Sequence, residues 1–345
     1  MRLRIALLLI VAGLVGAWFV ARPAAVEEKK PKDTVAAVQA RAPDLPVANT
    51  EIAGLAGGPL IGLADNRPET MLDPRFEQSG IKRMRVLVPY DDIARGGIRV
   101  RYLDSWLQTA RGRGIEPLVS FYRSYQDRHR LPSVETFRRD FRLFRKRYPW
   151  VRYFSTWDEA NFPAAQPTGN NPRRTARFYR AIRGDCSRGR CTVITAGFRA
   201  DGSAHSARWL SEFKRHIGRG PHIWGLVSHP DVNRFQSVYT QDFLRETRGP
   251  VWVTEVGAIH FFGRGLRPSI PRQTRAMRYL MSAYPRVSSR IERMYVYHWR
   301  AARGDSLFDS ALLSVEGEAR PAYREFFSAL GKPAPALPGG QVRPE

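Results

Sequence analysis

The strongest constraint on the fold is a regular alternation of short apolar runs with longer amphipathic stretches, from about residue 55 onward. Each run has the length of a buried strand, and most of the intervening stretches carry the period of a helix. Eight runs alternate in this way: 59–65, 84–91, 116–124, 151–159, 192–201, 223–231, 251–258 and 293–300. Helical patterns follow at 100–114, 133–149, 171–184, 206–218, 272–285 and 320–331.

Eight buried strands that alternate with helices predict an α/β fold, specifically a closed (β/α)8 barrel. An open doubly wound sheet is the alternative, but no Gly-rich phosphate-binding loop follows the first run. We therefore expect one barrel domain over residues 51–333. A monomer is expected.

The N-terminal segment has a different character from the barrel. Arg2 and Arg4 precede an uncharged run over 5–21, which predicts a signal peptide or signal anchor in residues 1–22. The arginines should stay in the cytoplasm, so the remainder is expected to be exported. Because no small-x-small cleavage site follows directly, an uncleaved helix that anchors the protein to the membrane is favoured. Residues 23–50 are rich in Ala, Pro and charge and predict a linker, and 334–345 predict a disordered tail.

The two cysteines agree with export. Cys186 and Cys191 bracket the polar sequence "SRGR", and in an oxidising compartment such a pair forms a disulfide by default. Two free thiols are the alternative. No histidine neighbours the pair, so a zinc site is not expected there. No metal or organic cofactor is implied elsewhere.

The formal net charge of +24 at pH 7 comes mostly from arginine. Such a charge can indicate a nucleic-acid binder. However, the arginines are distributed over almost every predicted helix, for example in 138–147 and 171–183. We therefore expect no nucleic-acid partner and instead an affinity for anionic polymers of the cell envelope. A biased base composition of the gene would produce the same pattern.

Polar side chains end several of the predicted strands, and in a barrel these ends converge on one mouth. Asp158 and Glu159 follow the fourth run, and Glu255 ends the seventh. The first two could simply cap a helix. Two glutamates that face each other across a cleft are also the apparatus of glycoside hydrolysis, in which one carboxyl is protonated and the other ionised.

Five segments resemble, in order, the motifs of the clan A retaining glycoside hydrolases, in particular family 39-like and cellulase-like (family 5-like) members. They are "TWDEAN" (156–161), "VSHPD" (227–231), "WVTEVG" (252–257), "YVYHW" (295–299) and "LLSVEGEARPAYREF" (312–326). The resemblance covers about residues 55–332. It implies that Glu159 is the acid/base and Glu255 the nucleophile.

The same resemblance implies further site residues. Arg85 would support the nucleophile, His229 would line the cleft, and Trp299 would stack beneath the sugar. Each has a structural alternative: an ion pair inside the barrel for Arg85, a loop histidine for His229, and core packing for Trp299.

Two positions depart from the family pattern. Asp158 replaces the Asn that precedes the acid/base, and an ionised Asp only accepts hydrogen bonds. Asp158 must therefore be protonated, paired with an Arg, or facing a donor such as an amino group. Asp231 replaces a Tyr that supports the nucleophile. Three tyrosines could supply the missing phenol: Tyr239, Tyr122 and Tyr297.

The sequence therefore predicts a retaining hydrolase of an extracellular or cell-envelope polysaccharide or oligosaccharide. The alternative is a catalytically impaired barrel that binds acidic glycans.

Overall fold

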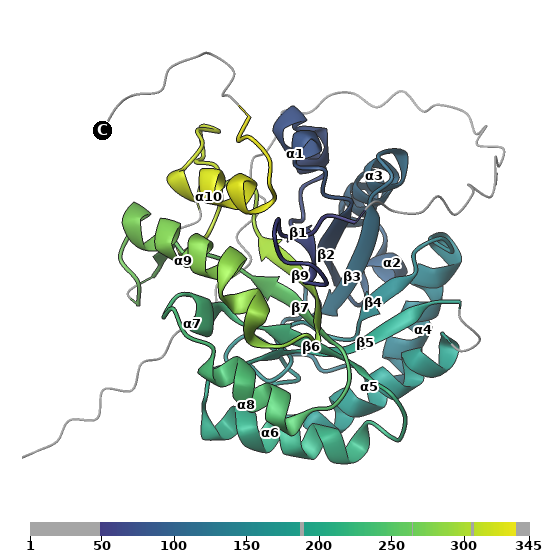
Figure 1. Ribbon diagram of the computed structural model, residues 1–345. Coiled ribbons are helices and arrows are strands. Elements are labelled where there is room, and N and C mark those ends of the chain that lie inside the picture. Colours follow the sequence, from purple (N-terminus) through teal and green to yellow (C-terminus); the bar gives the residue numbers. More distant parts are fainter. Residues whose placement is uncertain (1–48, 187–189, 264, 305–306, 336–345) are drawn as a thin grey trace, which may run out of the picture.

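The computed structural model describes residues 49–186, 190–263, 265–304 and 307–335 (Figure 1). The predicted signal or anchor segment, nearly all of the predicted linker and most of the predicted tail lie outside these residues. Within the described ranges, no helix is long and apolar enough to cross a membrane.

Eight parallel strands form a closed barrel, as the alternation of apolar runs predicts. The last strand pairs with the first, with Leu60 opposite Arg293, and this pairing closes the ring. In chain order the barrel strands are β1 (Leu60–Ala64), β2 (Arg83–Pro89), β3 (Glu116–Tyr122), β4 (Tyr153–Ser155), β5 (Thr192–Arg199), β6 (Ile223–Val227), β7 (Val251–Val256) and β9 (Ile291–Tyr297).

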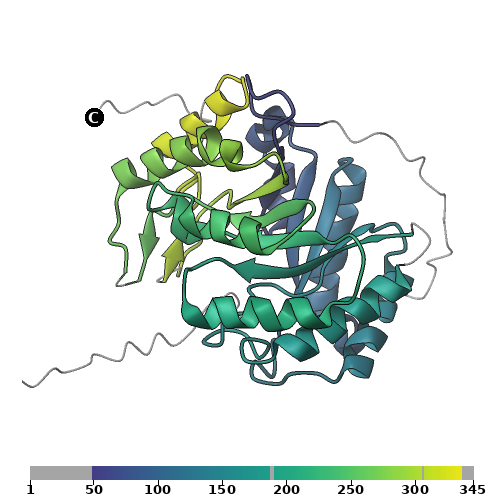
Figure 2. The same cartoon turned by 60° about the horizontal axis from the view of Figure 1, so that its bottom comes forward.

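Helices cover the outside of the barrel (Figures 1 and 2). The six predicted ones are present as α3 (Ile98–Gly112), α4 (Val134–Arg147), α5 (Pro172–Asp185), α6 (Ala204–His216), α9 (Ile270–Ser282) and α10 (Pro321–Ala329). Serines begin three of them: the hydroxyls of Ser133, Ser203 and Ser269 accept backbone N–H groups of α4, α6 and α9.

The sequence did not predict the helix between β6 and β7. This helix, α8 (Val238–Glu246), buries only Thr240 and Phe243, so its apolar period is too weak to recognise. Five short helical elements were also missed: η1 (Pro68–Leu72), α1 (Pro74–Ser79), α2 (Asp92–Arg95), α7 (His229–Val232) and η2 (Tyr284–Val287).

The apolar core has two parts. The larger lies between the strands and the helices, and it contains Met84, Val86 and Val88 of β2. The smaller joins side chains of five strands: Ala64, Leu118, Ile194, Trp252 and Tyr295. Alternation along β2 turns Arg83 and Arg85 away from the helix-facing side chains.

The strand starts that form the N-terminal end of the barrel hold a charged cluster. Arg83 and Arg293 both pair with Glu116. The guanidinium of Arg293 also lies 3.8 Å from the ring centre of Trp252, within the range of a cation–π interaction. These contacts fill that end, so the opposite end is left for chemistry.

Two features lie outside the barrel itself. The short strands β8 (Phe261–Phe262) and β10 (Phe308–Asp309) pair antiparallel and join the segments that follow β7 and β9. Cys186 and Cys191 form the predicted disulfide, with an S–S distance of 2.01 Å, between the end of α5 and the start of β5.

Candidate active site

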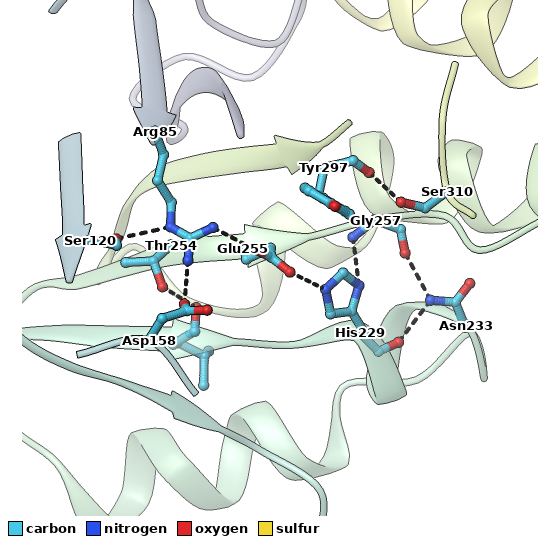
Figure 3. A network of polar contacts seen from close by, with 11 residues as sticks. Arg85, Ser120, Asp158, His229, Asn233, Thr254, Glu255, Gly257, Tyr297 and Ser310 are labelled. Atoms are coloured by element: carbon cyan, nitrogen blue, oxygen red, sulfur yellow. Dashed lines mark hydrogen bonds and ion pairs between the residues drawn. The ribbon is translucent and has the colours of Figure 1, made fainter. Parts of the chain in front are cut away.

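Glu255 reaches the interior of the barrel because β7 is irregular near its end. The register of β7 shifts against β9 between Val253 and Val256, and against β6 between Leu226 and Val227. In a regular strand Thr254 and Glu255 would point to opposite faces. The irregularity brings both into the barrel interior, where Glu255 contacts Arg85 and Thr254 lies beside Asp158 (Figure 3).

Arg85, on β2, lies at the centre of the site (Figure 3) and connects β3, β7 and the turn after β4. Its Nη1 donates to Oε2 of Glu255, and its Nη2 donates to Oδ1 of Asp158. Its Nε donates to Oγ of Ser120 at 2.9 Å. The side chain is 1% exposed, so these three partners replace the water that a buried guanidinium loses.

His229 is the second partner of Glu255. Its Nδ1 accepts the backbone N–H of Gly257 at 3.1 Å, which leaves the ring proton on Nε2. Nε2 lies 3.0 Å from Oε1 of Glu255 and donates to it. Asn233 fixes the two backbones, because its Nδ2 donates to the carbonyl oxygens of His229 and Gly257, both at 2.8 Å.

These contacts keep Glu255 ionised. Burial opposes its negative charge, but the charge of Arg85 and the hydrogen bond from His229 outweigh burial. Together they lower the pKa of Glu255 to about 2. The carboxylate is thus anionic throughout the physiological pH range and is held at both oxygens.

Asp158 and Glu159 lie in the turn after β4, which hydrogen bonds hold on both sides. The N–H of Asp158 donates to Phe121 O at 2.8 Å, and the N–H of Ala160 donates to Gly197 O at 2.9 Å. Between them Glu159 adopts a φ of 42°, a left-handed conformation that is uncommon outside glycine. Such backbone geometry concentrates at functional sites.

Both carboxyls of this turn resist ionisation. Burial raises the pKa of Asp158 to about 7; the charge of Arg85 opposes this rise, and the negative charges of Glu255 and Glu159 add to it. Burial and the charge of Glu255 also raise the pKa of Glu159, although Arg199 partly opposes this rise. Three carboxyls share this mouth, and one of them is held ionised while two are shifted toward the protonated form.

The predicted tyrosines occupy different positions. Tyr297, at the end of β9, has its ring 6.4 Å from that of His229 and 5.8 Å from that of Phe308. Tyr122 instead bonds to Arg99, which pairs with Asp92 at 3.0 Å. Tyr297 therefore lies beside the partner of Glu255, whereas Tyr122 faces the α2–α3 region.

The expectation that Trp299 stacks beneath a sugar is wrong. Its side chain is in the core, 1% exposed, and its indole N–H donates to Asp73 at 3.0 Å. Its ring packs edge-on against Phe76 at 5.6 Å and Tyr323 at 5.8 Å. Neither face is open to a ligand, so core packing, the alternative interpretation, describes this residue.

Asp231 and Asn161 have structural roles. Asp231 is fully buried and accepts the backbone N–H groups of Tyr239 at 3.2 Å and Thr240 at 2.7 Å, at the start of α8. Asn161 donates to Arg199 O and accepts Arg199 N–H, and so fastens the β4 turn to the end of β5.

Arg199 and Gly197 also lie at the site, although neither was predicted from the sequence. Arg199 ends β5, much as Glu255 lies near the end of β7, and this position at a strand end could have indicated it. A Cβ at Gly197 would lie 3.3 Å from Thr254 Oγ1, which is a tight contact, and 3.6 Å from Asp158 Oδ1, so the glycine keeps space for Thr254 beside Asp158. Among the described residues, no cluster of His, Cys, Asp and Glu is arranged to hold a metal ion.

Comparison with solved structures finds the same fold in several glycoside hydrolases. An endo-1,4-β-xylanase of Penicillium canescens is 13% identical, with a TM-score of 0.58 over 81% of this chain and 96% of its own. A family GH128 endo-β-1,3-glucanase of Pseudomonas viridiflava is 17% identical, with a TM-score of 0.52 over 79% and 98%. Xylanase 10B of Thermotoga maritima is 9% identical, with a TM-score of 0.55 over 79% and 94%.

The chain has the fold of these glycoside hydrolases. By sequence it matches no protein-family model, and no curated protein matches it significantly. At these identities the likeness concerns the fold alone.

Proposed function

We propose that the protein is a retaining glycoside hydrolase that cleaves O-glycosidic bonds by double displacement. The proposal rests on one observation: two glutamates at the same mouth have pKa values shifted in opposite directions. Glu255 is held ionised by Arg85 and His229, while the pKa of Glu159 is raised by burial and by Glu255. An ionised nucleophile and a protonated acid are the two groups that the reaction requires.

In the first step, the Glu255 carboxylate attacks the anomeric carbon and the glycosidic C–O bond breaks. Glu159 transfers its proton to the leaving oxygen, so the departing sugar leaves as a neutral alcohol. Arg85 and His229 position the carboxylate through one donor to each oxygen, and each carboxylate oxygen retains a second lone pair for attack.

In the second step, Glu159 is ionised and accepts a proton from water, which attacks the anomeric carbon and releases Glu255. The negative charge that raised the pKa of Glu159 is absent while Glu255 is esterified. The pKa of Glu159 therefore falls in the intermediate, which suits its change from acid to base.

Asp158 stands where related enzymes carry an amide donor. With a pKa raised to about 7, its carboxyl can hold a proton and donate a hydrogen bond at neutral and acidic pH. The sequence requires Asp158 to be protonated, paired with an Arg, or facing a donor. The raised pKa and the hydrogen bond from Arg85 meet the first two of these conditions. We propose that protonated Asp158 donates to a sugar hydroxyl.

We propose a polysaccharide or oligosaccharide as substrate. The similar structures include endo-acting enzymes named for xylan and β-1,3-glucan. Export is part of the same proposal, and the Cys186–Cys191 disulfide supports it because such bonds persist in oxidising compartments.

The test uses Glu159→Ala and Glu255→Ala, with Glu316→Ala, an exposed glutamate outside the mouth, as the matched control. Glu159→Ala should lose hydrolysis of unactivated oligosaccharides yet retain aryl glycosides whose leaving group needs no proton. Azide should then restore turnover, because a small anion attacks the intermediate without a general base. Glu255→Ala should lose turnover on every substrate.

A panel of activated fluoroglycosides would identify the sugar, since a trapped adduct on Glu255 is visible in the intact mass. Hydrolysis of an unactivated oligosaccharide by Glu159→Ala at the wild-type rate would refute the assignment. The pair Asp158–Glu159 would then be structural.

A further inference from the structure

Two adjoining hollows lie on the outer face of the barrel between α4 and α5, away from the mouth. One, of about 370 Å³, lies between Arg138 of α4 and Arg177 and Arg180 of α5. The other, of about 320 Å³, is lined by Arg142, Arg145, Lys146 and Arg190. The two helices pack side by side (Figure 1). The hollows adjoin, because Arg138 of the first pairs with Asp185 of the second. We call them together the α4–α5 groove.

The groove gathers positive charge that the sequence appeared to distribute evenly. Of the residues that the structure describes, seven arginines and lysines line it, against two acids, Glu135 and Asp185. Asp185 already forms ion pairs with Arg138 at 2.6 Å and with Arg142 at 2.9 Å. Glu135 is therefore the one remaining carboxylate of the described lining for three exposed cations, Arg177, Arg180 and Lys146.

Repulsion between cations is visible at one end of the groove. Arg145 donates to the carbonyl oxygen of Val151 and lies 5.6 Å from the ring centre of Phe154. Burial lowers its pKa, and the positive charges of Arg190 and Arg152 lower it further. A bound anion would relieve this repulsion.

The cations follow a line rather than surround a point. On α4 they occupy positions 138, 142, 145 and 146, and on α5 positions 177 and 180, which are the spacings that share one helix face. From Val134 to Lys146 this face extends about 18 Å at 1.5 Å per residue. A linear polymer with repeated charges fits such a row better than a single small anion.

We propose that the α4–α5 groove binds an anionic polysaccharide through the carboxylate groups of successive sugar units. Guanidinium groups bind carboxylates in a bidentate manner, and the row supplies several at intervals. Single-stranded nucleic acid is less suited, because its binding sites carry aromatic side chains for base stacking. In the described part of the lining the one aromatic residue is Phe141, which is 1% exposed.

The disulfide also favours a polysaccharide. Arg190 lies within the loop that Cys186 and Cys191 close, and such a bond indicates an oxidising compartment, where nucleic acid is scarce. This binding site lies outside the mouth and does not depend on the proposed hydrolase activity.

The test measures the affinity of the full chain for sodium polygalacturonate at about 0.1 M salt, where the screening length is about 10 Å. The groove variant is Arg177→Glu/Arg180→Glu. The matched control, Arg101→Glu/Arg324→Glu, makes the same change of net charge on exposed residues of α3 and α10. Thermal unfolding verifies that each variant is folded.

We expect the groove variant to bind about tenfold more weakly or worse, because local contacts and their counterion release are lost. The control should change affinity less than about twofold, since its charges are screened from the groove. Glu255→Ala should bind like the wild type, which separates this proposal from the hydrolase proposal.

Three outcomes would overturn the proposal. Equal losses in the groove and control variants would mean that net charge alone governs binding. Equal affinity for neutral dextran would mean that the carboxylates are not recognised. Tighter binding of a 20-nucleotide single-stranded DNA than of polygalacturonate at the same salt would assign the groove to nucleic acid.

Discussion

The protonation state of Asp158 should be visible in the pH dependence of folding stability. The comparison is between the wild type and the variant Asp158→Asn. The pKa of Asp158 in the folded protein is about 7, against an ordinary value of 3.8. The folded state therefore keeps a proton that the unfolded chain loses. The contribution of Asp158 to stability is fully present below about pH 4 and is lost as the pH rises through about 7.

The size of the effect follows from the difference between these two pKa values. At 1.36 kcal/mol per pKa unit, the wild type loses about 4 kcal/mol of unfolding free energy from this group between pH 4 and pH 8. Asn does not titrate, so Asp158→Asn escapes this loss. Relative to the wild type, the variant should gain about 4 kcal/mol of stability across that interval.

Asp65→Asn is the matched control, because Asp65 is also a buried aspartate at a strand end with an arginine partner. Its Oδ2 lies 2.9 Å from Arg67 Nη2. Burial raises its pKa, but Arg67 outweighs burial and the pKa is lowered. Its stabilising contribution is therefore complete above pH 4. Asp65→Asn should destabilise the protein by an amount that hardly changes between pH 4 and pH 8.

Urea denaturation of the three proteins at pH 4, 5, 6, 7 and 8 gives the required free energies. If the difference between Asp158→Asn and the wild type stays constant within about 1 kcal/mol over this range, Asp158 is ionised throughout. The pairing with Arg85 would then dominate, and a protonated Asp158 could not be the donor to the sugar.

Three further outcomes are expected. Arg85→Met should raise the pKa of Glu255 from about 2, because the charge of Arg85 is lost and burial is then opposed chiefly by His229. The acid limb of kcat/KM should move to higher pH, and an unmoved limb would contradict the role of Arg85. Cys186→Ser/Cys191→Ser should lose about 2 kcal/mol of unfolding free energy for so short a loop, and alkylation of both thiols in protein from its native compartment would remove the argument for export. Gly257→Ala places a Cβ 2.4 Å from Tyr297 O and should lower the free energy of unfolding by about 1–3 kcal/mol. In Gly112→Ala the Cβ meets open space, so this control should gain about 0.5–1 kcal/mol. Melting temperatures of the two variants check both signs.

The barrel could be predicted because each strand is a continuous apolar run between recognisable turns. Both faces of a barrel strand are buried, so the run itself marks the strand. The prediction failed where burial is slight. Helix α8 buries Thr240 and Phe243 only, and α1 has six residues, so neither leaves a periodic pattern.

For the site, the sequence predicted which residues lie at strand ends but not the directions of their side chains. Glu255 could be placed at the end of the seventh run, but its direction depends on the irregular register of β7, which no local pattern encodes. Trp299 was misassigned for a related reason. It lies two residues beyond β9, where the chain has already turned into a core completed by Phe76 of α1.

The β8–β10 ribbon limits how this barrel can change its specificity. In most barrels each loop at the mouth can be exchanged independently, which allows new activities to arise one loop at a time. Here the segments after β7 and β9 are joined by backbone pairing of Phe262 with Phe308, and the Phe308 ring lies 5.4 Å from that of His229. An insertion in either segment would displace the other and disturb the partner of Glu255. The two loops therefore have to evolve, or be redesigned, as one unit.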